Sequence, residues 1–267
     1  YTNSMKSGGK KQKLSKLILV IIYLILNILM FQDIMRRETV VSKDTNVLVM
    51  GTNATFKPFE YKDGDTVVGF DVDLAEEIAK SIGAELKIED MSFDGLLPAL
   101  ESGQIDLAVA GMSVTEDRAK NAFFSDPYYV ASQQIVVRSE SSIKNKYELV
   151  NKTIGVQLGT TGDQMARQIN GAKVVQFPAV PNVLQELTTG RIDAAILDNA
   201  PAAQYVAGFS NLKVLSLPLS REPYAVAIKK GNQQLLDQVN RVITEMRGDG
   251  RMQKILMKHF GTTEGQL

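Results

Sequence analysis

The sequence predicts an α/β protein built from two similar lobes, and two observations lead to this prediction. The first is that candidate strands alternate with candidate amphipathic helices, an order that produces parallel sheets covered by helices. The second is an internal repeat. Residues 93–111 and 180–198 align at one constant offset and share the pattern Gly-x-Ile-Asp, at Gly103–Asp106 and Gly190–Asp193. Each copy is typical of a short helix, a glycine that ends it and a buried strand.

The elements follow in order along the chain. Five apolar or alternating segments have the length of strands, and they cover residues 47–51, 85–89, 153–157, 174–177 and 194–197. Between the first two strands, the spacing of apolar residues predicts a helix over 70–82 that Gly83 ends. A second helix is expected to end near Ser102, and the second lobe has a helix that starts near Thr160.

Two apolar runs, 134–138 and 224–229, are expected to connect the lobes as paired crossovers, after which 234–259 forms helices that return to the first lobe. The N-terminal segment is expected to cover residues 1–43, and a tail covers 262–267. The first lobe is expected to combine 44–133 with 224–261, and the second lobe to cover 134–223. Because ligands of open α/β sheets bind at the carboxyl ends of strands, Ala110-Gly111 and Leu197-Asp198 are expected to face a cleft that closes by hinge motion.

The formal net charge of zero is the sum of two unequal parts. Residues 1–43 contain eight basic and two acidic residues, so the rest of the chain carries an equal excess of acid. The body therefore lacks the basic field that nucleic-acid binding needs. The chain has no cysteine, which excludes disulfides, cysteine-ligated metals and thiol catalysis, and its single histidine, His259, leaves little material for a metal site. We expect no metal and no cofactor.

The N-terminal segment predicts export. Five lysines between Lys6 and Lys16 precede the apolar run 17–31, the layout of a secretory signal. The run is short for a membrane-spanning helix, which needs roughly 20 apolar residues. No small-residue cleavage pattern follows Phe31, and no cysteine offers a lipid anchor. A cleaved signal and an uncleaved anchor at 17–31 both remain open, and either places the body outside the cytoplasm.

Side chains near the predicted strand ends suit the charged groups of a zwitterion. Arg118 could hold a carboxylate through a bidentate pair, and Asp198 suits an ammonium. Phe56 and Phe93 offer rings for the remainder, and the helix start at 159–163 could hold an anion. Each has a plainer alternative. Arg118 could be a solvated helix arginine and Asp198 a helix N-cap, the two phenylalanines could be core aromatics, and 159–163 could hold an ordinary threonine cap.

Five motifs carry a family resemblance: Thr52–Tyr61, Gly69–Leu74, Gly111–Arg118, Phe124–Tyr128 and Gln157–Gly162. Together they resemble the extracytoplasmic solute-binding proteins of polar amino-acid ABC importers, above all the members that bind glutamine or that bind arginine, lysine and histidine. The resemblance runs from about Val47 to Gly261. It implies a type II periplasmic-binding-protein fold, with two hinge crossovers and a ligand cleft between the lobes, and no catalytic residue.

The resemblance also implies roles for individual residues. The family's carboxylate arginine corresponds to Arg118, its hydroxyl partner to Ser113 and its ammonium aspartate to Asp198. The family's ring pair corresponds to Phe56 and Phe93, and its loop contacts correspond to Ala110, Gly111, Met112 and Thr161. Around the side-chain end of the cleft lie Asn53, Gln157 and Glu60.

Departures from the family pattern leave the ligand open. Binders of basic amino acids often carry an aspartate where this chain has Asn53, which weakens the case for lysine because a buried ammonium needs a countercharge. Glutamine keeps amide partners in Asn53 and Gln157, whereas arginine could use ring stacking and Glu60. The expected partners are a free L-amino acid and an importer permease, with the protein a monomer. A membrane-anchored sensor is one alternative, and a dehydratase-like enzyme with Glu60 as acid is another.

Overall fold

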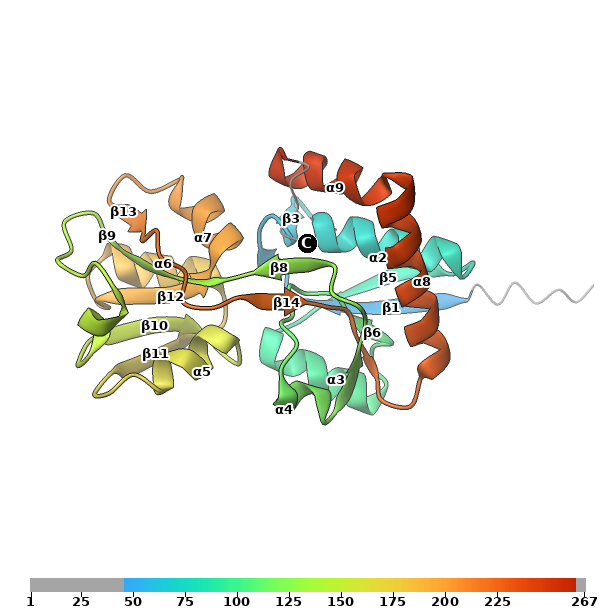
Figure 1. Cartoon of the computed structure of the whole chain (residues 1–267), viewed down its shortest axis with the longest axis horizontal. Coiled ribbons are helices and arrows are strands. Elements are labelled where there is room, and N and C mark those ends of the chain that lie inside the picture. The colour runs from blue at the N-terminus through green and yellow to red at the C-terminus, as the bar shows by residue number, and fades with distance from the viewer. Residues whose placement is uncertain (1–45, 263–267) are drawn as a thin grey trace, which may run out of the picture. The chain divides into compact units, whose positions relative to one another are not determined.

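The computed structural model describes residues 46–262 (Figure 1). The predicted N-terminal segment, with its apolar run 17–31, lies outside the described residues, and so do residues 263–267 of the predicted tail. In the part of the chain that the structure describes, no helix combines the length and the apolar character that a membrane crossing requires. The described residues belong to one compact unit that contains two five-stranded sheets.

The first sheet has the strand order β5-β1-β6-β15-β7. Its strands are β1 (Val47–Thr52), β5 (Glu85–Asp90), β6 (Leu107–Ala108), β7 (Ala122–Phe124) and β15 (Ala227–Lys229). Its helices are α2 (Phe70–Ser81), the 3-10 turn η1 (Phe93–Gly95), α3 (Leu96–Ser102), α8 (Gln233–Asp249) and α9 (Arg251–Phe260). β1 pairs in parallel with β5 and β6, as the strand–helix alternation predicts, while β15 pairs antiparallel with β6 and β7.

The alternation of side chains along β1 explains why helices cover both faces of this sheet. Leu48 and Met50 point into the core that α2 and α8 share, whereas Val49 packs on the cluster around Leu100 of α3. Figure 1 shows α2 and α3 on opposite sides of β1. A strand buried on both faces is apolar along its whole length, which is the pattern that the sequence shows at 47–51.

The second sheet repeats this plan with the order β11-β10-β12-β9-β13. Its strands are β9 (Gln133–Arg138), β10 (Thr153–Gln157), β11 (Lys173–Phe177), β12 (Ala194–Asp198) and β13 (Leu212–Val214). Its helices are η2 (Lys146–Leu149), α5 (Thr161–Arg167), α6 (Val180–Thr188) and α7 (Asn199–Val206). β10 pairs in parallel with β11 and β12, and β9 pairs antiparallel with β12 and β13. The two sheets therefore share strand order and direction.

The aspartates of the internal repeat have the same role in both sheets. Asp106 Oδ2 accepts a hydrogen bond of 2.8 Å from the backbone N–H of Val49 in β1. Asp193 Oδ2 accepts one of 2.8 Å from the backbone N–H of Thr153 in β10. Each aspartate directly precedes one strand, β6 or β12, and binds the backbone of the neighbouring parallel strand, β1 or β10. The repeat predicted from the sequence is a structural one.

The isoleucines of the repeat also have matching partners. A Cβ atom on Gly51 would lie 2.3 Å from Ile105 Cδ1, and a Cβ atom on Gly155 would lie 2.3 Å from Ile192 Cδ1. Because real Cβ atoms do not approach other atoms this closely, each central strand needs a glycine where the isoleucine packs. Strand packing therefore explains the isoleucine and the aspartate of the Gly-x-Ile-Asp pattern. Its glycines, Gly103 and Gly190, have φ of 80° and 77° and follow the helices α3 and α6.

Two short strands connect the sheets, and they lie next to the segments that the sequence predicts as crossovers. β8 (Tyr129–Ala131) and β14 (Glu222–Tyr224) pair antiparallel and run between the two sheets (Figure 1). The predicted crossover 134–138 is wrong, because these residues form part of β9 inside the second sheet, and most of 224–229 lies beyond β14 and ends in β15 of the first. An apolar run is the signature of a core strand, whereas β14 contains a glutamate and a proline.

A third small sheet precedes α2 and was not predicted from the sequence. It consists of β2 (Thr55–Phe56), β3 (Glu60–Asp63) and β4 (Thr66–Val68), paired antiparallel. Strands of two to four residues leave too short an alternation to recognise. The short helix α4 (Glu116–Ala119) lies between β6 and β7. These two small elements matter because each carries a residue that lines the cavity described below.

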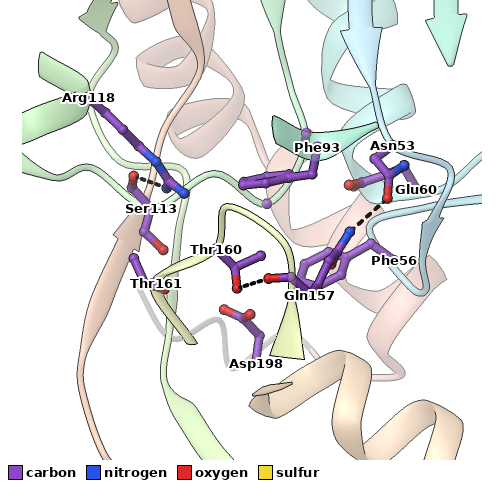
Figure 2. A pocket seen from close by; sticks show the side chains of 12 residues that line it. Asn53, Phe56, Glu60, Phe93, Ser113, Arg118, Gln157, Thr160, Thr161 and Asp198 are labelled. Atoms are coloured by element: carbon purple, nitrogen blue, oxygen red, sulfur yellow. Dashed lines mark hydrogen bonds between the residues drawn. The ribbon is translucent and has the colours of Figure 1, made fainter. Parts of the chain in front are cut away.

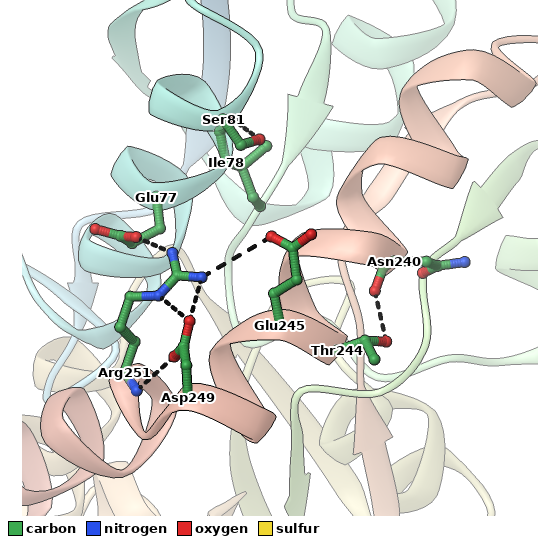
Figure 3. Close-up of polar contacts among 8 residues, drawn as sticks. All are labelled: Glu77, Ile78, Ser81, Asn240, Thr244, Glu245, Asp249 and Arg251. Carbon is green, nitrogen blue, oxygen red and sulfur yellow. Dashed lines mark hydrogen bonds and ion pairs between the residues drawn. The ribbon is translucent and has the colours of Figure 1, made fainter.

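The C-terminal helices α8 and α9 return to the first sheet, as predicted, and an arginine joins them to α2. Arg251, the first residue of α9, forms an ion pair with Glu77 of α2 (Figure 3). It also pairs with two residues of α8, Asp249 at 2.7 Å and Glu245 at 4.0 Å. These carboxylates raise the pKa of Arg251. The contacts fix the sharp bend between α8 and α9, which Gly250 makes with a φ of 87°.

Candidate ligand-binding site

A cavity lies where the strand ends of both sheets meet (Figure 2). Its empty volume, counted together with the adjoining space open to solvent, is about 300 Å³. It is lined by Asn53, Phe56, Glu60, Phe93, Ala110, Gly111, Ser113, Arg118, Gln157, Thr160, Thr161 and Asp198. Asn53 follows β1, Gln157 ends β10 and Asp198 ends β12, so the lining side chains sit at the carboxyl ends of parallel strands. The structure thus brings together eleven of the twelve residues that the sequence and the resemblance single out.

Met112 is the exception. Its side chain is buried in the cluster beneath the first sheet, among Ala110 and Leu96, and it is not part of the cavity wall. In an extended segment, neighbouring side chains point to opposite sides, so a cavity-facing Ser113 places Met112 in the core. The expectation that Met112 lines the loop toward the ligand is therefore wrong for its side chain.

The two sheet-bearing halves contact each other directly around the cavity. Gln157 Nε2 donates to Asn53 Oδ1 at 3.0 Å, and Arg118 Nη2 donates to the carbonyl of Gly159 at 3.0 Å. On α7, the hydroxyl of Tyr205 donates to the carbonyl of Thr55 at 2.9 Å. Each hydrogen bond joins a residue of the first half to one of the second.

Arg118 is a buried cation and not a solvated helix residue. Its backbone N–H binds Thr115, the N-cap of α4, at 3.2 Å, which fixes the direction of the short helix. The guanidinium is 5.2 Å from the centre of the Phe93 ring, and Nη1 donates to the carbonyl of Ser113 at 2.7 Å. Burial lowers the pKa of Arg118, although Asp198 and Glu222 oppose this. Both hydrogen bonds go to carbonyl oxygens, so the group can still pair with a carboxylate.

Asp198 stands at the N-cap position of α7, but its side chain makes no capping hydrogen bond. The carboxylate instead accepts a hydrogen bond from the hydroxyl of Tyr224. Burial raises the pKa of Asp198 to about 6, against the lowering effect of that hydrogen bond. A buried carboxylate at the cavity wall can hold an ammonium group, and Asp198 occupies the N-cap position of α7 without capping it through its side chain.

Phe56 and Phe93 both line the cavity, on the first half. Phe56 stacks on Phe59, with ring centres 5.7 Å apart, so one face of its ring belongs to the core. Gly111 has a φ of 52°, and a Cβ atom there would lie 2.5 Å from the ring of Phe56. The glycine therefore lets the backbone approach the ring closely, and its N–H donates to Asp71 Oδ2 at 2.7 Å.

The two amide side chains of the cavity are already paired within the protein. Asn53 Nδ2 donates to the carbonyl of Met91 at 2.7 Å, and Asn53 Oδ1 accepts from Gln157 and, at 2.7 Å, from the hydroxyl of Thr55. Gln157 Nε2 also donates to the carbonyl of Pro178 at 3.3 Å. These groups shape the wall of the cavity, and most of their hydrogen-bonding capacity is used.

Glu60 is the least satisfied polar group of the site. It opens β3 and is fully buried, and among the described residues no N–H or hydroxyl group donates to either of its carboxyl oxygens. Its neighbour is the carboxyl group of Asp71, with which a protonated Glu60 shares a hydrogen bond. Burial, the neighbouring Asp71 and the charge of Asp198 raise the pKa of Glu60 well above its usual value. Asp71 itself accepts hydrogen bonds from Gly111 and, at 2.8 Å, from Tyr128, and burial raises its pKa to about 6. Glu60 therefore needs either a proton or a cationic partner.

Thr160 and Glu222 are polar residues at the site that the sequence did not single out as ligand contacts. Thr160 is the N-cap of α5, accepting from the N–H of Asp163 at 3.2 Å, so the cap interpretation of 159–163 is confirmed. Glu222 lies just outside the cavity wall and accepts hydrogen bonds from Ser113 and Thr161. An acidic residue beside a proline in a short connecting strand is the single signal for it. Within residues 46–262, no cluster of histidine and acidic side chains could hold a metal ion.

Known proteins match the chain over nearly all of its described part. The model of bacterial extracellular solute-binding proteins, family 3, matches residues 48–262. The arginine-binding extracellular protein ArtP of Bacillus subtilis is 37% identical over 219 residues, which cover 80% of this chain and 86% of that protein.

Two solved structures have the same fold and similar sequences. Holo ArgBP from T. maritima superposes with a TM-score of 0.74 at 45% identity, covering 79% of this chain and 96% of that one. An ancestral arginine-binding protein bound to glutamine has a TM-score of 0.76 at 44% identity, covering 81% and 98%. The predicted two-lobed periplasmic-binding-protein fold is confirmed, and the chain belongs to the bacterial extracellular solute-binding proteins of family 3.

Proposed function

We propose that the protein captures a free L-amino acid, arginine in preference to glutamine, and delivers it outside the cytoplasm to the permease of an ABC importer. Membership of the solute-binding family supports the general role. Relatives and neighbouring structures named as arginine-binding support the ligand class. The choice of arginine rests on the charges and hydrogen-bonding groups of the cavity.

One end of the cavity suits the α-carboxylate and α-ammonium that every amino acid carries. Arg118 offers the carboxylate a cation whose present partners are neutral carbonyls. Asp198 offers the ammonium a buried carboxylate. Such charge-assisted hydrogen bonds are stronger than neutral ones, and in a site without water they are worth more than at the surface.

Glu60 carries the choice of side chain. A guanidinium has five N–H donors and no acceptor, so it suits a buried carboxylate whose two oxygens both lack a donor. In a complex with arginine, the guanidinium of the ligand would pair with Glu60, and its α-carboxylate and α-ammonium would pair with Arg118 and Asp198. The charges of the ligand and of these three residues would then cancel. A ligand without this charge would leave Glu60 protonated or uncompensated, and an uncompensated buried carboxylate costs about 3–5 kcal/mol.

Glutamine is the second candidate, and one observation favours it. The raised pKa of Glu60 means that the protonated carboxyl can donate to the carbonyl of a glutamine side chain. The expected amide partners Asn53 and Gln157 support glutamine less than the sequence suggested, because the structure pairs them with each other. The two ligands therefore differ in the charge state that they demand of Glu60.

Isothermal titration calorimetry on the wild type and on Glu60→Gln tests this proposal. We expect the variant to bind arginine at least about a hundredfold more weakly, near the lower end of the cost of breaking a buried ion pair. Its affinity for glutamine should change less than about threefold. Glu85→Gln, which removes an exposed acid of β5, is the matched control and should leave both affinities unchanged. Arginine affinity that survives in Glu60→Gln would contradict the arginine assignment, and a wild type that binds neither ligand would contradict the function.

The remaining parts of the proposal concern the context of binding. We infer that two lobes, 44–133 with 224–261 and 134–223, close on the ligand about β8 and β14, and that a monomer does so. A membrane-anchored sensor would use the same cavity, and the intact mass of the exported protein separates a retained N-terminus from a cleaved one. The compared relatives are named as binding proteins, which supports a role without catalysis.

A further inference from the structure

The buried carboxylate of Glu222 joins parts of the protein that belong to different halves. Its Oε2 accepts hydrogen bonds of 2.6 Å from the hydroxyls of Ser113 and Thr161, and its Oε1 accepts one of 2.7 Å from Ser220. Ser113 belongs to the loop after β6 of the first sheet, and Thr161 is the first residue of α5, which packs on the second sheet. Glu222 itself stands on the connecting strand β14.

The attachment to the first half is rigid. Ser113 forms a backbone bridge to Tyr224 of β14, and the N–H of Val114 donates to the carbonyl of Pro223 at 2.9 Å. The contact between Ser113 and Glu222 is therefore built into this strand pairing. No backbone pairing accompanies the contact between Glu222 and Thr161. It is supported through side chains, because Gln133 of β9 donates to Thr161 through Nε2 and to the Ser220 hydroxyl through its N–H. A rotation of the second sheet would therefore break this contact before the one to Ser113.

The direction of the hydrogen bonds follows from the chemistry of the groups. An ionised carboxylate only accepts hydrogen bonds, and a hydroxyl has a single hydrogen to donate. Ser113 and Thr161 therefore both donate that hydrogen to Glu222. In agreement, Gln133 Nε2 donates to Thr161 Oγ1 at 3.1 Å. Ser113 Oγ can still accept hydrogen bonds, Thr161 Oγ1 keeps one lone pair beside the bond from Gln133, and both residues line the cavity. The charge on Glu222 thus decides how these two hydroxyls are presented to a ligand.

We propose that Glu222 is a positioning residue of the ligand site: its carboxylate locks Thr161 of the second half to Ser113 of the first and so holds the closed cavity together. It acts through these hydroxyls and not by touching the ligand. Closure that ends in a buried, charge-assisted contact between the halves slows ligand escape, because the contact must break before the cavity opens. The proposal rests on the proposed function only for its ligand.

Ligand kinetics test the lock. With arginine as probe in stopped-flow measurements, Glu222→Gln and Glu222→Ala should raise the dissociation rate about tenfold or more, while the association rate stays within about threefold. Thr161→Val should have a similar effect, and adding it to Glu222→Gln should change little, because both remove the same contact. Glu85→Gln is the matched control. A Glu222→Gln variant with a lower melting temperature but an unchanged dissociation rate would show a structural role alone and overturn the proposal.

A second measurement does not need a ligand. Because the chain has no cysteine, Glu101→Cys and Gln168→Cys place one spin label on each half, at exposed positions on α3 and next to α5. The distance distribution of the ligand-free protein should contain a short component that Glu222→Ala lacks. Equal distributions in the two proteins would overturn the lock, whatever the ligand proves to be. Failure of the wild type to bind arginine, with the short component present, would count against the proposed function only.

Discussion

The pH dependence of ligand affinity follows from the burial of Asp198. Its carboxylate must be ionised to hold an ammonium, yet burial raises its pKa to about 6 in the ligand-free protein. An acid whose pKa is raised in this way binds a proton more readily than a free aspartate, and a bound ammonium would lower that pKa again. Ligand binding below pH 6 should therefore release a proton, and affinity should rise with pH through this range.

The size of the effect follows from the same pKa. With a pKa of about 6, roughly one-eleventh of Asp198 is ionised at pH 5 and roughly ten-elevenths at pH 7, so the apparent affinity should fall about tenfold between pH 7 and pH 5. Glu60 adds to this for arginine, because its raised pKa means that a second proton has to leave when a guanidinium arrives. The loss for arginine should therefore exceed tenfold, whereas glutamine should show the contribution of Asp198 alone.

Calorimetric titration at pH 5, 6, 7 and 8, repeated in buffers of different ionisation enthalpy, measures both the affinity and the number of protons released. Asp198→Asn should bind both ligands weakly at every pH. The residual affinity of this variant for glutamine should no longer depend on pH between 5 and 7, because the ionisation of Asp198 has been removed. An affinity for arginine that stays constant between pH 5 and pH 7 would refute the reasoning, since neither buried carboxyl would then have to ionise for binding.

Four further substitutions test the geometry. Arg118→Ala should reduce amino-acid affinity by about 3–5 kcal/mol, measured by calorimetry, because the buried carboxylate of the ligand would lose its cation; affinity within threefold of the wild type would place the site elsewhere. Gly111→Ala should lower the melting temperature and weaken binding together, since its Cβ would lie 2.5 Å from Phe56 and φ is 52°; an unchanged melting temperature would contradict this. Asp106→Ala and Asp193→Ala should each cost about 1–3 kcal/mol of unfolding free energy in urea denaturation, because a partly buried strand N–H loses its acceptor in each case. A marked inequality between the two costs would argue against their equivalent roles.

The fold was largely predictable because its signals are local and repeated. Period-two and helical patterns locate the core strands and helices, and the shared Gly-x-Ile-Asp pattern reveals the second sheet as a copy of the first. The positions of Arg118 and Asp198 follow from the rule that ligands meet the carboxyl ends of parallel strands. The short sheet that carries Glu60 gave no such signal, so the placement of Glu60 in the cavity rested on the family resemblance.

The failures of prediction have a common physical cause, since they concern which of several possible contacts a side chain makes. Met112 stands beside cavity residues in the sequence, but the extended backbone points it into the core. Asn53 and Gln157 line the cavity as suitable amides for a ligand, yet Gln157 Nε2 donates to Asn53 Oδ1 and Asn53 Nδ2 donates to Met91. Glu222 gains its role from hydroxyls far away in the chain. Such pairings arise between elements and leave no periodic trace in the sequence.

The tyrosines between the halves have an optical consequence. The chain has eight tyrosines and no tryptophan, so its intrinsic fluorescence comes from tyrosine alone. Tyr128 and Tyr224 donate hydrogen bonds to the buried carboxylates of Asp71 and Asp198, and Tyr205 bridges the halves through its hydroxyl. A hydrogen bond to a carboxylate quenches the emission of a tyrosine, so opening and closing of the cavity should change the brightness of the protein. The proposed closure of the lobes can then be followed in real time in the unlabelled protein.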